Sequence, residues 1–230
     1  MIHLDADCQI QPYSGKAPRS LAVLLHGVGA NGYDLLPLAT LWAPYLPDTL
    51  FISPHAPEPY DEYPEDAALW LDEMAPYQWF SLKNITPENR ALRAEAVLPE
   101  LDRFIQTQLA EHGLSVENLL LIGFSQGTIM ALYWAIKQKS PCAGILAYSG
   151  RLIQTDSHFI PQAKMPIMLV HGSDDPVIPI QEHHQAMETL TKWQFPVTGF
   201  VDLGEGHTIS ENGERLGLRF LRESLEPVKT

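Results

Sequence analysis

The sequence predicts an α/β fold with a mostly parallel central sheet and helices on both of its faces. Short apolar runs alternate with longer amphipathic segments along most of the chain. Strands of a parallel sheet are covered on both faces, so they read as continuous apolar runs with helical segments between them. A second observation is a tight turn, Gly-Phe-Ser-Gln-Gly at 123–127, where an apolar run passes directly into a helical pattern.

Outside residues 54–82, the expected strands and helices largely alternate along the chain. The opening segment, 2–13, alternates enough to form an edge strand. Buried strands are expected at 21–27, 49–53, 119–124, 143–149, 166–172 and 196–203. Helices are expected at 33–43, about 87–112, 126–139, 180–192 and 211–225. No repeat, charge block or flexible linker breaks this order, so the sequence predicts one domain over residues 1–230.

Composition and charge exclude several classes of function. The formal net charge of −13 argues against binding to nucleic acid, whose phosphates attract Lys and Arg, and against docking on anionic membranes. Cys8 and Cys142 lack CxxC spacing, so we expect two buried reduced thiols and neither a metal site nor a disulfide. The N-terminus has no secretory pattern, and no apolar run reaches the roughly 18 residues of a membrane span. We therefore expect a cytoplasmic protein without stable membrane insertion.

Ser125 lies at the tip of the strand-to-helix turn, with Gly123 and Gly127 two residues away on each side. A serine nucleophile in this position must expose its Oγ, and the sharp turn needs glycines where the strand and the helix approach each other. The alternative is a turn that happens to contain serine. Because the pattern stands between a predicted strand and a predicted helix, we interpret it as a nucleophile elbow.

A nucleophilic serine needs a base, and the base needs an acid that orients it. In this architecture the expected chain order is Ser, then Asp or Glu, then His. His207 follows the last predicted strand in a Gly-rich turn, and we predict that it is the base. His171 ends a strand and is expected to pack or to orient the next loop. His183 and His184 fall within a predicted helix and are expected at the solvated surface.

Asp174 and Asp175 compete for the role of the acid. Asp175 precedes Pro176, which biases its backbone toward an extended conformation and so points the side chain in a fixed direction. Asp174 could instead cap the turn or the helix that follows. We predict that Asp175 orients His207.

The tetrahedral intermediate of acyl transfer also needs two aimed N–H donors. Gln126 follows the serine at a helix N-terminus, where the helix dipole favours an anion. The second donor is expected from the Gly-rich segment 24–34, with Val28 supplying the N–H. The alternative for this segment is a plain turn into a helix capped by Asn31 or Asp34.

Four motifs at these separations resemble one family of small hydrolases. They are LLHGVGANGYDL at 24–35, GFSQG at 123–127, HGSDDPVIP at 171–179 and GEGHTIS at 204–210. Together they look like the phospholipase/carboxylesterase family of α/β-hydrolases, the acyl-protein-thioesterase-like serine esterases. The resemblance spans nearly the whole chain. It implies an α/β-hydrolase fold without a large cap domain and hydrolysis of carboxylic esters or thioesters.

Residue by residue, the resemblance assigns Ser125, Asp175 and His207 to a catalytic triad and the N–H groups of Val28 and Gln126 to an oxyanion hole. One segment departs from the family pattern. The family often has Trp-Phe-Asp before its long helix, where this chain has LWLDEM and YQWFSL. This difference bears on acyl-chain and leaving-group specificity and leaves the chemistry unchanged.

Residues 54–82 interrupt the alternation of strands and helices. The segment is rich in Pro and aromatic residues, and it carries seven acidic residues and no Lys or Arg. Proline breaks helices and strands alike, and long ordered excursions are often functional. We expect an irregular loop near the active site that packs on the core and still walls a substrate pocket. Its candidate pocket residues are Trp70, Trp79 and Phe80.

The leading prediction is therefore a cofactor-free serine carboxylesterase that hydrolyses short to medium acyl esters through an acyl-enzyme intermediate. An acyl-protein thioesterase or a lysophospholipase would use the same groups. A non-catalytic binding protein of the same fold would not need to retain all three triad residues. A metallohydrolase is disfavoured, because the sequence shows no H-x-x-x-H and no carboxylate–His cluster at ligand spacing. The sequence is compatible with both a monomer and a homodimer.

Overall fold

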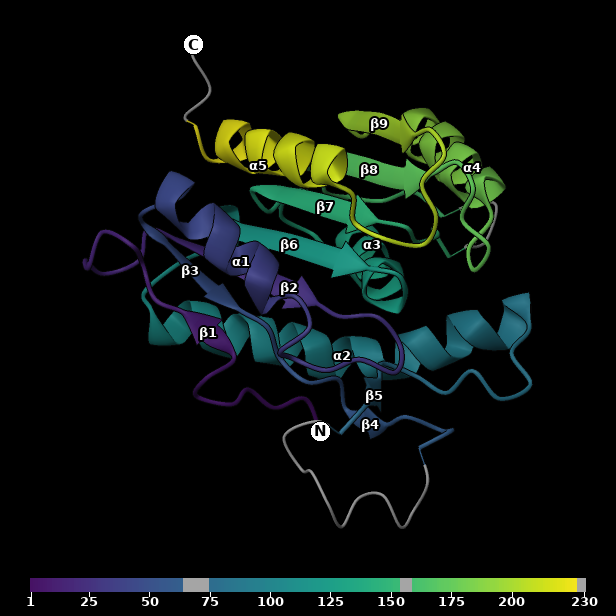
Figure 1. Ribbon diagram of the computed structural model, residues 1–230, viewed down its shortest axis with the longest axis horizontal. Coiled ribbons are helices and arrows are strands. Elements are labelled where there is room, and N and C mark those ends of the chain that lie inside the picture. The colour runs from purple at the N-terminus through teal and green to yellow at the C-terminus, as the bar shows by residue number, and fades with distance from the viewer. Residues whose placement is uncertain (64–74, 154–158, 227–230) are drawn as a thin grey trace.

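A computed structural model of the chain describes residues 1–63, 75–153 and 159–226 (Figure 1). Within these residues a seven-stranded sheet has the order β1-β3-β2-β6-β7-β8-β9. The edge strand β1 runs antiparallel to β3, and every other neighbouring pair is parallel. The strands are β1 (Gln9–Ile10), β2 (Ser20–Leu25), β3 (Thr49–Ile52), β6 (Leu119–Phe124), β7 (Gly144–Tyr148), β8 (Ile167–Gly172) and β9 (Val197–Asp202).

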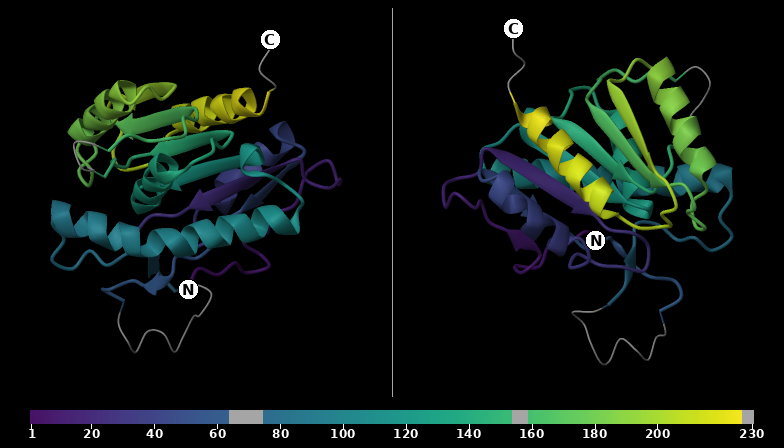
Figure 2. Two further views of the ribbon diagram at one scale, coloured as in Figure 1. Left: turned by 180° about the vertical axis from the view of Figure 1, so that it is seen from behind. Right: turned by 45° about the horizontal axis from the view of Figure 1, so that its top comes forward.

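Helices cover both faces of this sheet. The helices are α1 (Leu36–Trp42), α2 (Pro87–Glu111), α3 (Gln126–Lys137), α4 (Ile180–Lys192) and α5 (Glu211–Leu225), with short 3₁₀ turns at η1 (Ala43–Tyr45) and η4 (Val116–Asn118). Helices α1 and α5 lie on the near face in Figure 1, and the view from behind in Figure 2 brings α2 and α3 forward. The layered α/β arrangement is the one that the apolar runs predict.

The strand residues sort into two cores by the two-residue period of a strand. In β2, Leu21, Val23 and Leu25 join the cluster that contains α2, α3 and α4. Ala22 and Leu24, which point the other way, join the cluster that contains α1 and α5. Every residue of β2 is buried. Burial on both faces explains why the strand reads as an unbroken apolar run.

Two elements differ most from the sequence prediction, while the others differ by at most two residues at an end. The edge strand expected over 2–13 is reduced to β1 and an isolated bridge between His3 and His55, because a turn in which the Cys8 N–H donates to the Asp5 carbonyl separates them. The helix expected from residue 33 begins at Leu36, since Asn31 first holds a turn by accepting from the Tyr33 N–H at 2.9 Å. Asn31 therefore shapes the loop, and no side chain caps α1.

Two short stretches of the segment 54–82 pair as a small second sheet. Strand β4 (Glu58–Pro59) pairs antiparallel with β5 (Tyr77–Gln78). The free cysteines Cys8 and Cys142 are both buried, as predicted. Among the described residues, no helix has the length and apolar character that a membrane crossing requires.

Candidate active site

Ser125 occupies a backbone conformation that the surrounding chain forces on it. It lies between the last residue of β6 and the first residue of α3, with φ 55° and ψ −115°. A side-chain-bearing residue rarely adopts such a φ, and strain of this kind persists only where the neighbouring structure imposes it. A Cβ at Gly123 would lie 2.5 Å from the Thr128 nitrogen, and a Cβ at Gly127 would lie 1.9 Å from the Leu25 carbonyl oxygen. The two glycines therefore let α3 start directly against β6 and β2.

A chain of hydrogen bonds connects Ser125, His207 and Asp175. The Ser125 Oγ lies 2.9 Å from His207 Nε2, and His207 Nδ1 lies 2.7 Å from Asp175 Oδ2. A carboxylate only accepts, so Nδ1 carries the ring proton and Nε2 is left to accept from the serine hydroxyl. Residues separated by up to 82 positions in sequence are brought together by the carboxyl ends of β6, β8 and β9. The arrangement can remove a proton from Ser125 and stabilise the imidazolium that results.

Asp175 and Asp174 have different surroundings. The Asp175 side chain is fully shielded from solvent, and its Oδ1 accepts from the backbone N–H groups of Val177 and Ile178, each at 2.8 Å. Burial works against its charge, but the hydrogen bonds from the His207 ring and these N–H groups hold the pKa of Asp175 below its ordinary value. Asp174 is exposed, and its carboxylate accepts from Ser173 Oγ at 2.7 Å. Of the two candidates, the structure brings Asp175 to His207.

His171 braces the same carboxylate from behind. Its Nε2 lies 2.8 Å from the Ile178 carbonyl oxygen and 3.3 Å from Asp175 Oδ2. His183 packs on the His171 ring, with centroids 5.8 Å apart, and is 4% exposed. The expectation that His183 is a surface residue is wrong, because it lies on the face of α4 that packs under β9, beside Gly199. Burial lowers the pKa of His183 to about 4.

The two expected oxyanion donors belong to segments that adjoin the serine. A Cβ at Gly27 would lie 3.3 Å from the Ser125 Cβ, so the loop that carries Val28 runs against the serine. In the described part of the chain, neither the Val28 N–H nor the Gln126 N–H donates to a protein acceptor. His26 supports this loop, since its Nδ1 donates to the Gly27 carbonyl at 2.7 Å and its Nε2 accepts from the Ala56 N–H at 3.1 Å.

The 75–80 segment braces both donor positions. The Gly29 N–H donates to the Tyr77 carbonyl, and the Tyr77 N–H donates to the Ala30 carbonyl, both at 2.8 Å. The Gln126 side chain accepts from the Trp79 N–H at 2.8 Å and donates to the Phe80 carbonyl at 2.7 Å. These backbone contacts could not be found from the sequence, because they depend on no motif.

The predicted substrate-pocket residues need a correction. Trp79 has no exposed surface and Phe80 is 1% exposed, and both belong to the core that contains α2 and α3. The Trp79 Nε1 donates to the His26 carbonyl at 2.9 Å. These side chains therefore hold the loop against the sheet. The cavity that Phe80 borders lies beside Met1 and Arg93, and its lining includes none of Ser125, Asp175 and His207. Trp70, the third of these residues, lies outside the described residues.

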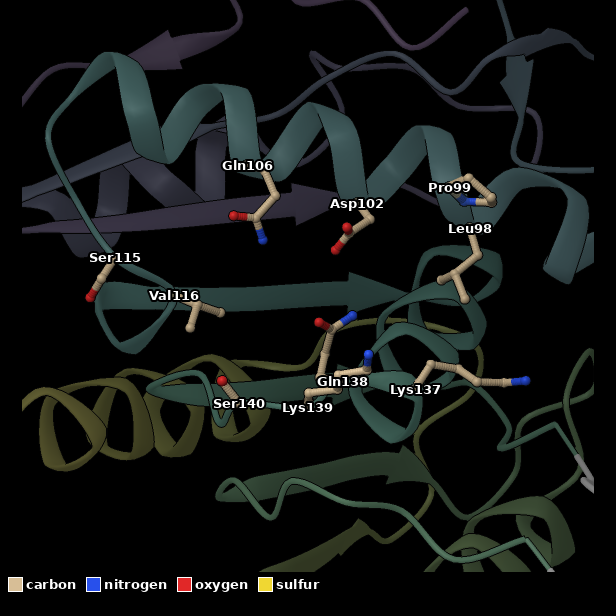
Figure 3. A pocket seen from close by; sticks show the side chains of 10 residues that line it. All are labelled: Leu98, Pro99, Asp102, Gln106, Ser115, Val116, Lys137, Gln138, Lys139 and Ser140. Carbon is tan, nitrogen blue, oxygen red and sulfur yellow. The ribbon is translucent and has the colours of Figure 1, made fainter.

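A cavity of about 340 Å³ borders His207. The residues that line it come from the start of α1, the end of β6, the loop after β9 and the start of α5, and they are Asp34, Leu35, Pro37, Leu38, Phe124, His207, Thr208, Ile209 and Glu214. A larger cavity, of about 670 Å³, lies between α2 and the end of α3 (Figure 3). It borders Val116 before β6 and Ser140 after α3, so it opens near the amino ends of the strands, away from Ser125. The larger of these two cavities is therefore not the one that borders the His207 side chain.

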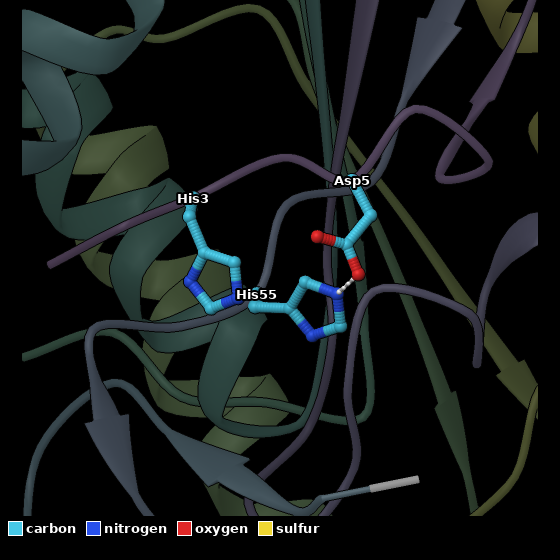
Figure 4. A group of neighbouring side chains, drawn as sticks. All are labelled: His3, Asp5 and His55. Atoms are coloured by element: carbon cyan, nitrogen blue, oxygen red, sulfur yellow. Dashed lines mark hydrogen bonds and ion pairs between the residues drawn. The ribbon is translucent and has the colours of Figure 1, made fainter. Parts of the chain in front are cut away.

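One cluster of potential metal ligands is present among the described residues. The ligand atoms of His3, Asp5 and His55 lie within 4.8 Å of one another (Figure 4). The sequence expectation of no carboxylate–His cluster missed it, because His55 joins the other two only through the bridge to the N-terminal segment. His55 Nδ1 accepts from the Gly32 N–H at 3.3 Å, which leaves the ring proton on Nε2, 3.1 Å from Asp5 Oδ2. Both ring nitrogens of His55 thus take part in hydrogen bonds within the protein. The cluster holds the N-terminal segment against the residues that follow β3.

The chain is similar to several esterases. The family model described as Phospholipase/Carboxylesterase matches residues 8–224. Esterase YpfH from Escherichia coli (strain K12) is 30% identical over 213 residues, which cover 91% of this chain and 85% of the relative. Acyl-protein thioesterase 1 from Kluyveromyces lactis is 28% identical over 188 residues, which cover 76% of this chain and 78% of the relative.

Solved structures show the same likeness. The crystal structure of esterase PE8 has a TM-score of 0.85 and 34% identity, and the match covers 94% of this chain and 97% of that one. The Bacillus cereus carboxylesterase has a TM-score of 0.74 at 18% identity, covering 94% of this chain and 93% of that one, which is a likeness of fold. The α/β-hydrolase fold predicted from the sequence is confirmed, and the described residues contain no cap domain.

Proposed function

Because the chain belongs to the phospholipase/carboxylesterase family of serine hydrolases, with esterase or thioesterase activity, we propose that it is a serine carboxylesterase that hydrolyses short to medium acyl esters through an acyl-enzyme intermediate. One observation carries the proposal: Ser125 Oγ and Asp175 Oδ2 lie 2.9 Å and 2.7 Å from the two nitrogens of the same imidazole, that of His207. The whole chain, 1–230, is proposed to act as one domain.

In the proposed mechanism, Ser125 Oγ attacks the carbonyl carbon of the ester while His207 Nε2 takes the hydroxyl proton. The carbonyl oxygen becomes an oxyanion that accepts from the N–H groups of Val28 and Gln126. His207 then gives its proton to the leaving oxygen, and the C–O bond breaks to leave an acyl group on Ser125. Water repeats the sequence and releases the carboxylic acid. Asp175 keeps the imidazole oriented throughout and stabilises its charged form.

The oxyanion donors contribute because they are already in place. The Val28 loop is held by the Tyr77 backbone and the Gln126 helix end by the 79–80 backbone, so neither has to reorganise when charge develops. Removing one such donor in other enzymes costs about 10²–10³-fold in kcat. The braced backbone supports an assignment that motif spacing alone suggests.

Small substrates fit the space beside His207. Each CH₂ removed from water contributes up to about 0.8 kcal/mol, so a long acyl chain gains affinity only where an apolar wall covers it. The cavity that borders His207 has about 340 Å³, near the lower end of the range for small-molecule sites. This volume favours esters in which the substituent beside His207 is small.

A second candidate, thioester hydrolysis, is favoured by the likeness to acyl-protein thioesterase 1. A thioester would use the same serine, base and oxyanion donors, with a thiol as the leaving group. A lysophospholipase would also use them, but the anionic phosphate of a lysophospholipid would have to approach the carboxylates of Asp34 and Glu214 beside His207. That repulsion favours neutral carboxylic esters over esters that carry a phosphate.

The test is a panel of p-nitrophenyl esters and acyl-thioesters whose acyl chains run from about 2 to about 12 carbons, because each added CH₂ changes the apolar area that can be buried. We expect kcat/KM to rise over the short chains and to fall beyond medium length, with esters ahead of thioesters of equal length. Thioesters ahead at every length would replace the proposed activity by the second candidate. No Ser125-dependent turnover of any substrate would contradict both.

A further inference from the structure

The cavity beside His207 has an apolar floor. Leu35 and Leu38 are buried at the start of α1, and Ile209 follows the base by two residues. Phe124, which precedes the serine, places its ring centroid 4.9 Å from that of His207, with the two planes at 42°. A group that fills the cavity therefore lies beside both an aromatic ring and the imidazole.

Among the residues that the structure describes, two carboxylates line the same cavity and no Lys or Arg does. Asp34 precedes α1, and Glu214 lies in the first turn of α5. Within the described ranges neither carboxylate takes part in an ion pair. Partial burial raises the pKa of Asp34 above its ordinary value. A cation bound in the cavity would offset this cost, because an opposite charge favours the ionised carboxylate.

The chemistry of His207 decides which part of a substrate enters. The leaving oxygen takes its proton from Nε2, so it must come within hydrogen-bond reach of that nitrogen. The leaving group then extends from a point beside the imidazole ring. Of the cavities found among the described residues, this one has the imidazole in its lining.

We propose that this cavity is a subsite for a leaving group that carries an ammonium ion, so that the preferred esters are those of amino alcohols. The inference rests on the proposed function and extends it to a substrate class. The face of an aromatic ring attracts a quaternary ammonium group, and nearby carboxylates attract its positive charge. Apolar methyl groups on the nitrogen would contact Leu35, Leu38 and Ile209, while the charge faces Asp34 and Glu214.

The experiment compares two esters of the same shape. Butyrylcholine, the butyrate ester of choline, and 3,3-dimethylbutyl butyrate differ in one atom, since a quaternary carbon replaces the nitrogen and removes the positive charge. We expect kcat/KM for the choline ester to exceed that for the neutral ester by about 10-fold at low salt, as for a cation that contacts one ring and two partly exposed carboxylates. The ratio should fall severalfold in 0.5 M NaCl, where the screening length is about 4 Å.

The variants separate the cavity from the overall charge of the protein. Asp34→Asn with Glu214→Gln should lower the ratio severalfold, to the smaller preference that the Phe124 ring alone supplies. Glu111→Gln with Glu117→Gln removes the same number of negative charges from exposed positions at the end of α2 and in η4, and it should keep the wild-type ratio. If both pairs lower the ratio equally, attraction by the net charge of −13 explains the preference and the subsite is contradicted.

Two further outcomes are distinguished by p-nitrophenyl butyrate, whose leaving group has no ammonium. Suppose that the enzyme hydrolyses this ester through Ser125 but has the same kcat/KM for the choline ester and the 3,3-dimethylbutyl ester. This result overturns the subsite and leaves the proposed function intact. Failure to hydrolyse it overturns the proposed function itself. A third comparison places the trimethylammonium group on the acyl chain of a p-nitrophenyl ester. A preference seen only there would show that the cavity receives the acyl group, which contradicts the assignment to the leaving group.

Discussion

A Cβ atom at Gly127 would lie 1.9 Å from the carbonyl oxygen of Leu25, so α3 meets β2 with no room for a side chain. Gly127→Ala should therefore displace the start of α3, which carries the Gln126 N–H. We expect a loss of at least about 2 kcal/mol in the free energy of unfolding, the scale of overpacking in a dense core. Urea unfolding measures it.

The matched control for this variant is Gly206→Ala. A Cβ at Gly206 would meet nothing within 4 Å, and its backbone has no positive φ. This variant should change the free energy of unfolding by less than about 0.5 kcal/mol. Equal losses for the two variants would mean that conformational freedom, and not the close approach to Leu25, explains the glycine at 127.

Replacement of the two neighbouring aspartates should have very different effects. Asp175→Asn removes the charge that holds the Nδ1 proton of His207, and we expect kcat to fall by about 10⁴-fold. Asp174→Asn leaves an exposed amide and should cost at most a few fold. Steady-state kinetics with p-nitrophenyl butyrate compares them. The opposite ranking would place the orienting carboxylate one residue earlier than the structure does.

Buried histidines should make the protein less stable in mild acid. Burial lowers the pKa of both His26 and His183 from 6.5 to about 4. Between those values the unfolded chain binds protons that the folded chain does not, so the free energy of unfolding rises with pH through this window and levels above 6.5. At pH 5 each histidine should lower it by up to about 2 kcal/mol relative to pH 7.

Urea unfolding at pH 7 and pH 5 tests this with His183→Gln. Relative to wild type, the variant should gain up to about 2 kcal/mol between the two pH values, since one of the protons no longer binds on unfolding. Met187→Leu, on the same helix and against Gly199, does not titrate and should differ from wild type by the same amount at both. A constant difference for His183→Gln would show that the ring is not held neutral in the folded chain.

Loss of the two hydrogen bonds that the Gln126 side chain makes should lower the free energy of unfolding. Its side chain satisfies the backbone N–H of Trp79 and the backbone carbonyl of Phe80, both in buried surroundings. Gln126→Met keeps the volume but leaves both groups unpaired, which should cost about 2–5 kcal/mol. Thermal and urea unfolding measure it. A neutral effect would mean that water reaches these groups in place of the amide.

Local chemistry explains which features could be predicted from the sequence. The strand runs and the elbow at Ser125 depend on neighbouring residues, so pattern and spacing are sufficient to find them. The choice of Asp175 over Asp174 rested on Pro176, and the structure brings that carboxylate to His207.

Tertiary placement explains the rest. His183 is polar in pattern, but α4 turns it toward His171 beneath β9. The aromatic composition of 54–82 predicts Trp79 on a pocket wall, but its Nε1 donates to the His26 carbonyl within the core. The cavity beside His207 is lined from four separate parts of the chain, which no local pattern joins.

The central claim is that Ser125 is the nucleophile activated by His207, and labelling by a fluorophosphonate tests it most directly. Intact-mass spectrometry should show one adduct per wild-type chain, with peptide mapping to Ser125, and no adduct on Ser125→Ala. His207→Gln should react at least about 100-fold more slowly, because the hydroxyl loses its base. An adduct of full stoichiometry on Ser125→Ala, or one mapped to another residue of the wild-type chain, would contradict the account.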